Sequence, residues 1–200
     1  MTTRSRGRRA DYAEATRTAI IDAARTLFAR QGYFATRVEQ IAQAARVAEG
    51  TVYAAGGKQG LLSLLVEEWA SFPVRQESID RLSEMDDPDE IFRLLARASG
   101  QVRRAHGDTM RILLTTAPHE KVAADGLATS TARYRATLAL VAERLHVLGR
   151  LPDGMTVHRA TDILWFYFGY SGYFTLIDEG WTLDEAEQWL REQCAAAVLG

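Results

Sequence analysis

Cysteine and long apolar runs are scarce in this sequence. The single cysteine, Cys194, cannot form an intrachain disulfide and is typical of a protein from a reducing compartment. No apolar run approaches the roughly 18 residues of a membrane span, and the basic N-terminus has no apolar segment of the signal-peptide kind behind it. We therefore expect a cytoplasmic protein that has no membrane partner.

The residue patterns that carry catalysis or metal binding are also missing. None of the four histidines stands four residues from another histidine or from the cysteine, so no metal site is predicted. The segment Gly56-Gly57-Lys58 falls short of a phosphate-binding loop, which needs glycine where Val52 stands and serine or threonine where Gln59 stands. Neither Gly-x-Ser-x-Gly nor Gly-x-Gly-x-x-Gly occurs. The sequence predicts no enzyme and no cofactor.

The small net charge of -2 conceals a strong asymmetry. Residues 1–62 hold ten Lys and Arg against five Asp and Glu, whereas residues 63–200 hold fourteen against twenty-one. A basic segment joined to an acidic remainder is typical of a DNA-binding domain followed by a domain with another task. Four of the basic residues form an N-terminal arm, which we expect to be disordered in the free protein and able to touch DNA when bound: Arg4, Arg6, Arg8 and Arg9.

The segment from residue 20 to residue 62 has the pattern of a helix-turn-helix. A first helix carries apolar residues at spacings of three and four, and Gly32-Tyr33 ends it. Thr36 and Glu39 predict a capping box that starts a second, short helix, and a break at 46–48 precedes a third. A short helix, a tight turn and a second short helix behind a supporting helix form a DNA-binding unit.

The rest of the chain predicts further helices and no strand. We expect helices over about 59–79, 87–104, 109–116, 118–148, 156–178 and 183–199, with a turn at 149–154. Asp87-Pro88 and Thr182 with Glu185 are strong helix starts. The predicted fold is all-α, about nine helices in total, with a basic arm and DNA-binding domain over 1–62 and a second helical domain over 63–200.

A set of positions in the helix-turn-helix segment matches a known family. The positions are Ile20, Ala23-Ala24, Leu27-Phe28, Gly32-Tyr33, Thr36, Val38, Ile41-Ala42, Ala45, Val47, Gly50-Thr51, Val52-Tyr53, Lys58 and Leu61-Leu62. With these residues the segment resembles the TetR family of transcriptional regulators. The resemblance implies a dimer that binds double-stranded DNA and responds to a small-molecule effector, with residues 63–200 as a helical ligand-binding and dimerisation domain.

The sequence departs from the family pattern in three respects. Arg46 stands in the turn where the family usually has glycine, and a non-glycine residue at positive φ costs on the order of 1 kcal/mol. The segment Ala54-Ala55-Gly56-Gly57 is one residue shorter than usual and lacks two large side chains. These departures affect the end of the third helix and one usual phosphate contact.

The resemblance implies which residues contact DNA. The third helix would enter the major groove, where Thr51 and Tyr53 face base edges or phosphates. Glu49 either accepts a hydrogen bond from a cytosine amino group or points away. The implied DNA-binding set is Thr36, Arg37, Glu49, Gly50, Thr51, Tyr53 and Lys58, of which Thr36, Arg37, Tyr53 and Lys58 would hold phosphates.

The effector pocket is implied by the family, and its residues are polar or aromatic side chains on otherwise apolar helices. Plain core packing is the competing explanation for each aromatic residue. A buried Arg111 would need an anionic partner, whereas a surface position needs none. The candidates are Trp69, Phe72, Phe92, Arg111, Tyr134, Trp165, Tyr167 and Tyr170.

The last two predicted helices resemble the pair through which TetR-like proteins dimerise. Small residues at a spacing of three or four allow close helix approach, and ordinary intrachain packing is the alternative. The predicted interface consists of Trp165, Gly169, Gly172, Leu176, Trp189 and Leu190.

The function that follows is a ligand-responsive, homodimeric repressor that binds a palindromic operator and is released by a small molecule. The alternative is a helical small-molecule-binding or protein-interaction dimer whose DNA-binding segment has degenerated. The departures at Arg46 and at residues 54–57 favour that alternative.

Overall fold

The computed structural model describes the backbone of residues 3–70 and 76–200 and the side chains of residues 10–70 and 79–200. Every regular element in this part of the chain is an α-helix, which confirms the predicted all-α fold. The chain divides into two compact units, one formed by residues 1–72 and 106–130 and the other by residues 73–105 and 131–200. Two long helices, α6 (Pro88–Thr116) and α7 (Lys121–Val147), contribute to both units.

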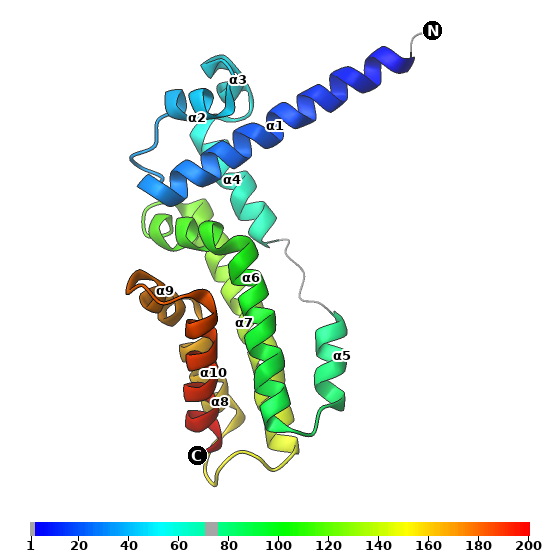
Figure 1. The fold of residues 1–200 in the computed structure, drawn as a ribbon, viewed down its shortest axis with the longest axis vertical. Coiled ribbons are helices and arrows are strands. Elements are labelled where there is room, and N and C mark those ends of the chain that lie inside the picture. Colours follow the sequence, from blue (N-terminus) through cyan, green and yellow to red (C-terminus); the bar gives the residue numbers. More distant parts are fainter. Residues whose placement is uncertain (1–2, 71–75) are drawn as a thin grey trace. The chain divides into compact units, whose positions relative to one another are not determined.

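The first unit is built around one long and three shorter helices (Figure 1). In chain order these are α1 (Thr3–Gln31), α2 (Val38–Ala45), α3 (Glu49–Ala54) and α4 (Gly57–Ala70). Each helix turns its apolar face inward, as the 3–4 spacing predicts, because burying that face supplies most of the stability of a short helix. The core contains Ile20, Ala24, Phe28, Ile41, Ala42, Val52, Leu61, Leu62 and Leu65.

Two features of this unit differ from the sequence-based expectations. Helix α1 begins at Thr3, so the basic arm continues a helix instead of forming an irregular tail. Once a helix is nucleated, adding residues to its end costs little, and arginine and alanine have high helix propensity. The start of α2 is shifted by one residue, since Arg37 is the N-cap and its backbone N–H donates to the Gln40 side chain at 2.8 Å. The predicted pairing of Thr36 with Glu39 was therefore wrong.

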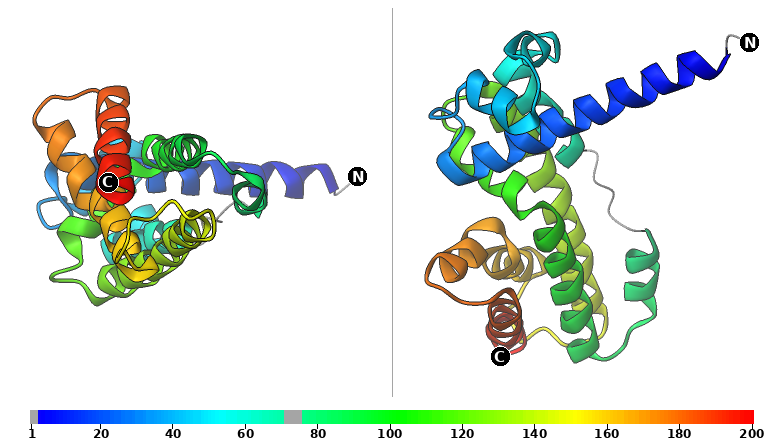
Figure 2. Two further views of the ribbon diagram at one scale, coloured as in Figure 1. Left: turned by 90° about the horizontal axis from the view of Figure 1, so that it is seen from below. Right: turned by 45° about the horizontal axis from the view of Figure 1, so that its top comes forward.

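The second unit combines the first part of α6 and the second part of α7 with four other helices. These are α5 (Gln76–Glu84), α8 (Val157–Phe168), α9 (Tyr170–Asp178) and α10 (Leu183–Leu199). Within this unit α6 and α7 lie side by side, and α10 packs against α8 and α9 (Figures 1 and 2). The shared core contains Ile91, Phe92, Leu95, Leu138, Val141, Leu145, Leu164, Phe168, Cys194 and Val198.

The predicted helix starts and the predicted turn are confirmed in this unit. Asp87 accepts a hydrogen bond from the Asp89 N–H at 2.9 Å, directly before the first turn of α6. Thr182 and Glu185 form a reciprocal capping box, in which hydrogen bonds from Thr182 lower the pKa of the Glu185 carboxyl. The segment 149–154 is a turn with Gly149 and Gly154 at positive φ.

Three helix boundaries differ from the prediction. Helix α4 ends at Ala70, well before Ile79. The expected break at Gly107-Asp108 lies at His106, whose φ of -132° interrupts α6 without ending it. The helix expected over 156–178 is two helices, since Gly169 adopts an extended conformation between α8 and α9. An added Cβ at Gly169 would lie 2.4 Å from the Trp165 carbonyl oxygen, which explains why glycine stands at this bend.

The turn between α2 and α3 contains a strained residue. Arg46 has φ 57° and ψ 43°, and it is the one non-glycine residue at positive φ in the described part of the chain. The turn is closed because the Val47 N–H donates to the Ala42 carbonyl at 3.0 Å. The left-handed conformation suits this closure but is unfavourable for a residue with a Cβ.

Replacing Arg46 by glycine should therefore stabilise the protein. We expect Arg46→Gly to raise the free energy of unfolding by about 0.5–1 kcal/mol, the relieved strain minus the larger unfolded-state entropy of glycine. Urea titration followed by circular dichroism measures the change. Arg46→Ala is the control, because it removes the same side chain and retains the Cβ. Equal stabilities of the two variants would contradict strain at this position.

Candidate functional site

The second short helix of the first unit is held by one buried residue and exposes the others. Val52 is fully buried, whereas Glu49, Gly50, Thr51 and Tyr53 are exposed, with Tyr53 at 62%. A helix of six residues cannot be stable alone, so its position depends on Val52 and on the turns at both ends. The arrangement presents the polar side chains of α3 to solvent on a fixed backbone.

The connection from α3 to α4 is the segment that departs from the family pattern. Only Ala55 and Gly56 separate the two helices, and both Gly56 and Gly57 have positive φ. A Cβ at Gly56 would lie 3.0 Å from the Gly60 Cα. The two glycines thus permit a shorter connection, and α3 and α4 remain in contact without the two large side chains.

Thr36 and Lys58 make contacts inside the domain. The Thr36 side chain is 2% exposed; its hydroxyl donates to the Gly32 carbonyl at 2.8 Å and accepts from Gln31 at 3.2 Å. The Lys58 ammonium donates to the carbonyls of Phe34 and Thr36 and lies 4.4 Å from the centre of the Tyr33 ring. Both residues therefore fix the segment that leads into α2.

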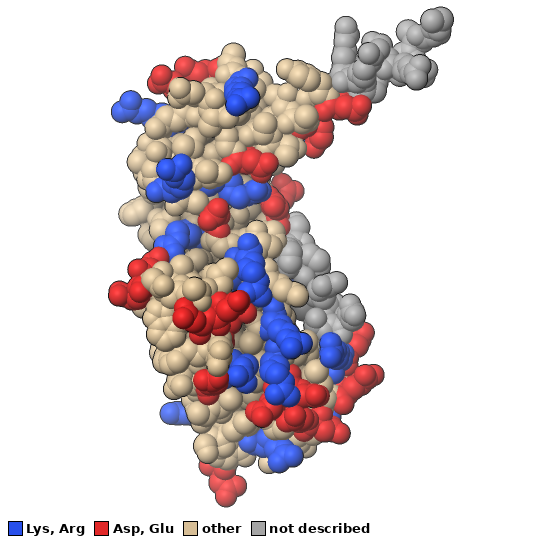
Figure 3. All heavy atoms as spheres, in the orientation of Figure 1, with Lys and Arg blue, Asp and Glu red and all other residues tan. Residues whose placement is uncertain are grey.

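Arg37 and Arg46 are exposed beside the two short helices. Arg25, in contrast, forms ion pairs with Asp22 and Glu68 at 2.9 and 2.7 Å. On the face shown in Figure 3, the basic side chains of the first unit are interspersed with acidic ones and form no continuous patch. Arg37, the exposed N-cap residue of α2, is a direct candidate for a phosphate contact.

The structure brings together only part of the predicted effector set. In the second unit, Tyr134, Trp165 and Tyr170 form a row of edge-to-face rings, with centroids 6.0 and 5.3 Å apart. Phe92 is fully buried, and Tyr167 is half-buried beside the same core. Trp69 and Arg111 belong to the first unit, and Phe72 lies outside the described residues.

Sequence reasoning missed a buried cation next to this aromatic row. Arg103 of α6 is 5% exposed and donates to the Phe168 carbonyl at 2.7 Å and, more weakly, to the Gly169 carbonyl at 3.4 Å. The Tyr134 hydroxyl donates to the same Phe168 carbonyl at 3.2 Å. The spacing of four from Leu95 to Ser99 to Arg103 was the available signal, because it places the arginine on the buried face of α6.

Within the predicted dimer set, the six residues differ in exposure. Leu190 is buried in the chain's own core, and Trp165, Gly172 and Leu176 are half-buried. The break at Gly169 places Trp165 on α8 and Gly172 and Leu176 on α9, so the predicted single-helix stripe was wrong. Trp189 is exposed and packs edge-on against exposed Trp181.

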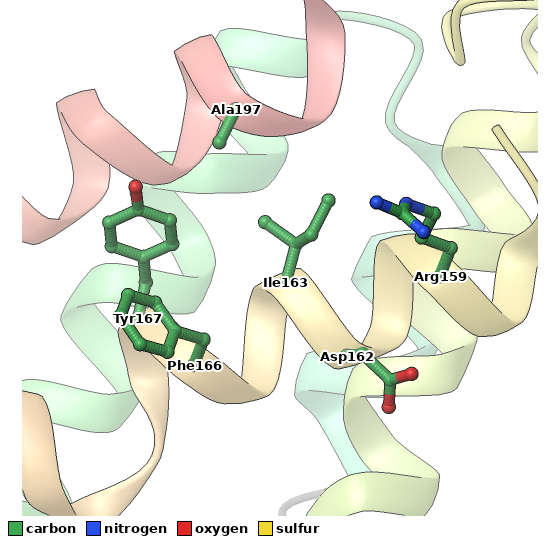
Figure 4. Close-up of a pocket in the computed structure, with 6 residues that line it drawn as sticks. All are labelled: Arg159, Asp162, Ile163, Phe166, Tyr167 and Ala197. Carbon is green, nitrogen blue, oxygen red and sulfur yellow. The ribbon is translucent and has the colours of Figure 1, made fainter.

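Sequence analysis did not single out Phe166 of α8, an aromatic side chain that is 73% exposed. It borders an open hollow between α8 and α10, in which Ile163 and Tyr167 point toward Ala197 (Figure 4). Asp162 at the edge of this hollow is hydrogen-bonded by Arg135, which lowers the pKa of the Asp162 carboxyl. Aromatic residues are enriched at protein interfaces, so the exposed Phe166 ring marks a candidate contact surface.

The remaining chemistry-bearing groups have no evident catalytic arrangement. Cys194 is fully buried, and burial raises the pKa of its thiol to about 12, so it stays protonated at neutral pH. Within residues 10–70 and 79–200, no three His, Cys, Asp or Glu side chains gather as a metal site would require. None of the described helices is both long and apolar enough to span a membrane.

A supporting helix, a short helix, a tight turn and a second short helix with an exposed polar face define a helix-turn-helix DNA-binding domain. Residues 20–64 match the family model described as bacterial regulatory proteins, tetR family. The predicted resemblance of this domain to the TetR family of transcriptional regulators is confirmed. No curated protein matches the sequence.

Solved structures with the same fold cover nearly the whole chain. A HlyIIR mutant protein has a TM-score of 0.69 at 15% identity, over 94% of this chain and 97% of that one. SmeT from Stenotrophomonas maltophilia, in complex with triclosan, has a TM-score of 0.67 at 20% identity, over 93% and 92%. NalD from Pseudomonas aeruginosa has a TM-score of 0.58 at 23% identity, over 94% and 98%. At these identities the likeness shows a shared fold.

Proposed function

We propose that the protein is a cytoplasmic, ligand-responsive repressor that binds a palindromic operator as a homodimer. The observation that carries this proposal is the geometry of α3, which Val52 anchors while Thr51 and Tyr53 remain exposed. In a helix-turn-helix this helix enters the major groove. We assign DNA binding to residues 1–62 and effector binding and dimerisation to residues 63–200.

The exposed residues suggest a division of roles on DNA. Thr51 and Tyr53 contact base edges, Glu49 meets a cytosine amino group or points away, and Gly50 allows close approach of the backbone. Arg37 contacts a phosphate directly. Thr36 and Lys58, whose side chains are engaged within the domain, act chiefly by holding the segment before α2 next to the DNA backbone.

Effector binding and repression are supported by proteins of the same fold. SmeT is described as the repressor of a multidrug efflux pump and was solved with triclosan, and a regulator from Saccharomonospora viridis was solved with choline. By analogy, a small molecule in the second unit changes the spacing of the two DNA-binding domains of a dimer. Their α3 helices then no longer match half-sites separated by about one helical turn or a multiple of it.

Neutralising Arg37 should weaken binding to all DNA sequences about equally. Removing one phosphate contact lowers the slope of log affinity against log salt by about 0.9, because one fewer counterion is released. Fluorescence anisotropy with Arg37→Gln over a salt series measures both effects. Arg97→Gln, an equal charge change at an exposed position of α6, is the control. Identical slopes for Arg37→Gln and the wild-type protein would remove Arg37 from the phosphate contacts.

Shortening the exposed side chains of α3 should reduce sequence discrimination. We expect Thr51→Ala and Tyr53→Ala each to cost about 1–3 kcal/mol on the preferred site, with a smaller loss on random DNA. The two affinities of each variant are compared at one salt concentration. If both affinities fell in parallel, these residues would position the domain without contributing to base recognition.

A charge at Phe166 should separate the dimer. If the hollow beside Phe166 faces a second copy, Phe166→Glu buries an unpaired carboxylate in the interface, which costs several kcal/mol. Sedimentation velocity should then show monomers, and operator affinity should fall because the two half-sites are no longer held together. Val147→Glu introduces the same charge at a 74% exposed position and should remain dimeric. A Phe166→Glu dimer of wild-type strength would exclude this face from the interface.

A further inference from the structure

The second unit contains a buried cation that has no ion-pair partner among the described residues. Arg103 donates through Nη2 to two backbone carbonyls, and its guanidinium lies 4.4 Å from the centre of the Tyr173 ring. Nη1 is buried and has no hydrogen-bond partner in the described part of the chain. A buried guanidinium normally uses several of its five donors, so Arg103 is incompletely satisfied.

The charge of Arg103 is only partly compensated. Among the described residues, no carboxylate reaches ion-pair distance of this guanidinium. Glu187 interacts with it at longer range and is itself paired with Arg104 at 2.9 Å. Burial lowers the pKa of Arg103, since a charge away from water is unfavourable, and Tyr134, Tyr173 and Glu187 oppose that shift. Such a group gains most from an added anion.

A second buried donor belongs to Tyr173, the residue whose ring lies against the Arg103 guanidinium. The Tyr173 hydroxyl is buried and has no hydrogen-bond partner within the described residues. Arg103 contacts the carbonyls of Phe168 and Gly169, directly before the first turn of α9, and the N-cap Gly169 gives that helix no side-chain cap. A helix N-terminus carries a partial positive charge. A buried guanidinium, a buried hydroxyl and a helix N-terminus together favour an anion.

The aromatic side chains near Arg103 indicate that the rest of the anion is apolar. The aromatic row of Tyr134, Trp165 and Tyr170 leads to the bend between α8 and α9 that Arg103 contacts. The Tyr134 hydroxyl already has hydrogen-bond partners, because it donates to the Phe168 carbonyl and lies 2.8 Å from the Ser99 hydroxyl oxygen. An apolar ligand body beside these rings would place its charged end at Arg103.

We propose that Arg103 and Tyr173 bind the carboxylate of an apolar monocarboxylic acid, and that this class of molecule is the effector. This inference rests on the proposed function and adds the chemical class of its ligand. The carboxylate accepts hydrogen bonds from Arg103 Nη1 and Tyr173 Oη, while the alkyl or aryl body contacts the aromatic row. Because Arg103 also bonds the backbone at the bend after α8, the ligand would act on the helix that carries Phe166.

Titration of the full-length protein with acids and their neutral counterparts tests the proposal. The probes are benzoate, phenylacetate, octanoate and decanoate, each paired with its primary amide, followed by calorimetry and by release of bound DNA. We expect at least one acid to bind tenfold or more tightly than its amide, since charge-assisted hydrogen bonds are the stronger ones. The same acid should release DNA at matching concentrations.

Two variants separate a ligand-binding role from a structural one. Tyr173→Phe and Arg103→Lys should each weaken acid binding about tenfold and amide binding by a smaller factor, because the amide oxygen can accept from the same donors but carries no charge. Arg97→Lys, on an exposed turn of the same helix, should bind like the wild-type protein. If Arg103→Lys fails to fold, Tyr173→Phe alone decides the result.

The outcomes that overturn the proposal are distinct from those that overturn the proposed function. If none of the four acids binds more tightly than its amide, or if both variants weaken acid and amide equally, the anion site is wrong. Binding of the unliganded wild-type protein to DNA is measured in the same preparation. DNA binding without any preference for acids rejects this inference alone, whereas absence of DNA binding rejects the regulator itself.

Discussion

The anchoring of α3 by Val52 is the constraint on which the proposed DNA binding depends. Six residues make too few intrahelical hydrogen bonds to hold a helix, and the exposed residues around Val52 contribute no packing. The backbone of α3 is therefore fixed by one buried side chain and by two tight turns, at Arg46 and at Gly56-Gly57. The strain at Arg46 is tolerated because the turn sets the direction in which α3 leaves α2.

The neighbouring contacts serve the same purpose. Lys58 and Thr36 look like phosphate ligands in the sequence, yet both bond the segment between α1 and α2. Their hydrogen bonds fix where α2 begins, and the buried pair Ile41 and Ala42 then holds α2 against the core. The domain thus keeps its polar residues exposed on rigid helices, as a protein that recognises a nucleic acid requires.

Much of the fold could be predicted from the sequence, because helical periodicity and capping residues act locally. The stripe from Ile20 to Phe28, the start at Asp87-Pro88 and the capping box at Thr182 are confirmed for that reason. The bend at Gly169 was missed because glycine within an apolar run is compatible with a continuous helix. Arg103 and Phe166 were missed because burial of a cation and exposure of an aromatic ring depend on tertiary packing, which periodicity does not report.

Selection of binding sites from random DNA with the full-length protein would show whether the dimer recognises a specific sequence. We expect an enriched motif with two-fold symmetry, in which identical half-sites are separated by about one helical turn or a multiple of it. Enrichment of this motif should decrease when the exposed side chains of α3 are shortened. Recovery of no enriched sequence would contradict DNA recognition, and a single half-site without its symmetric partner would contradict the dimer.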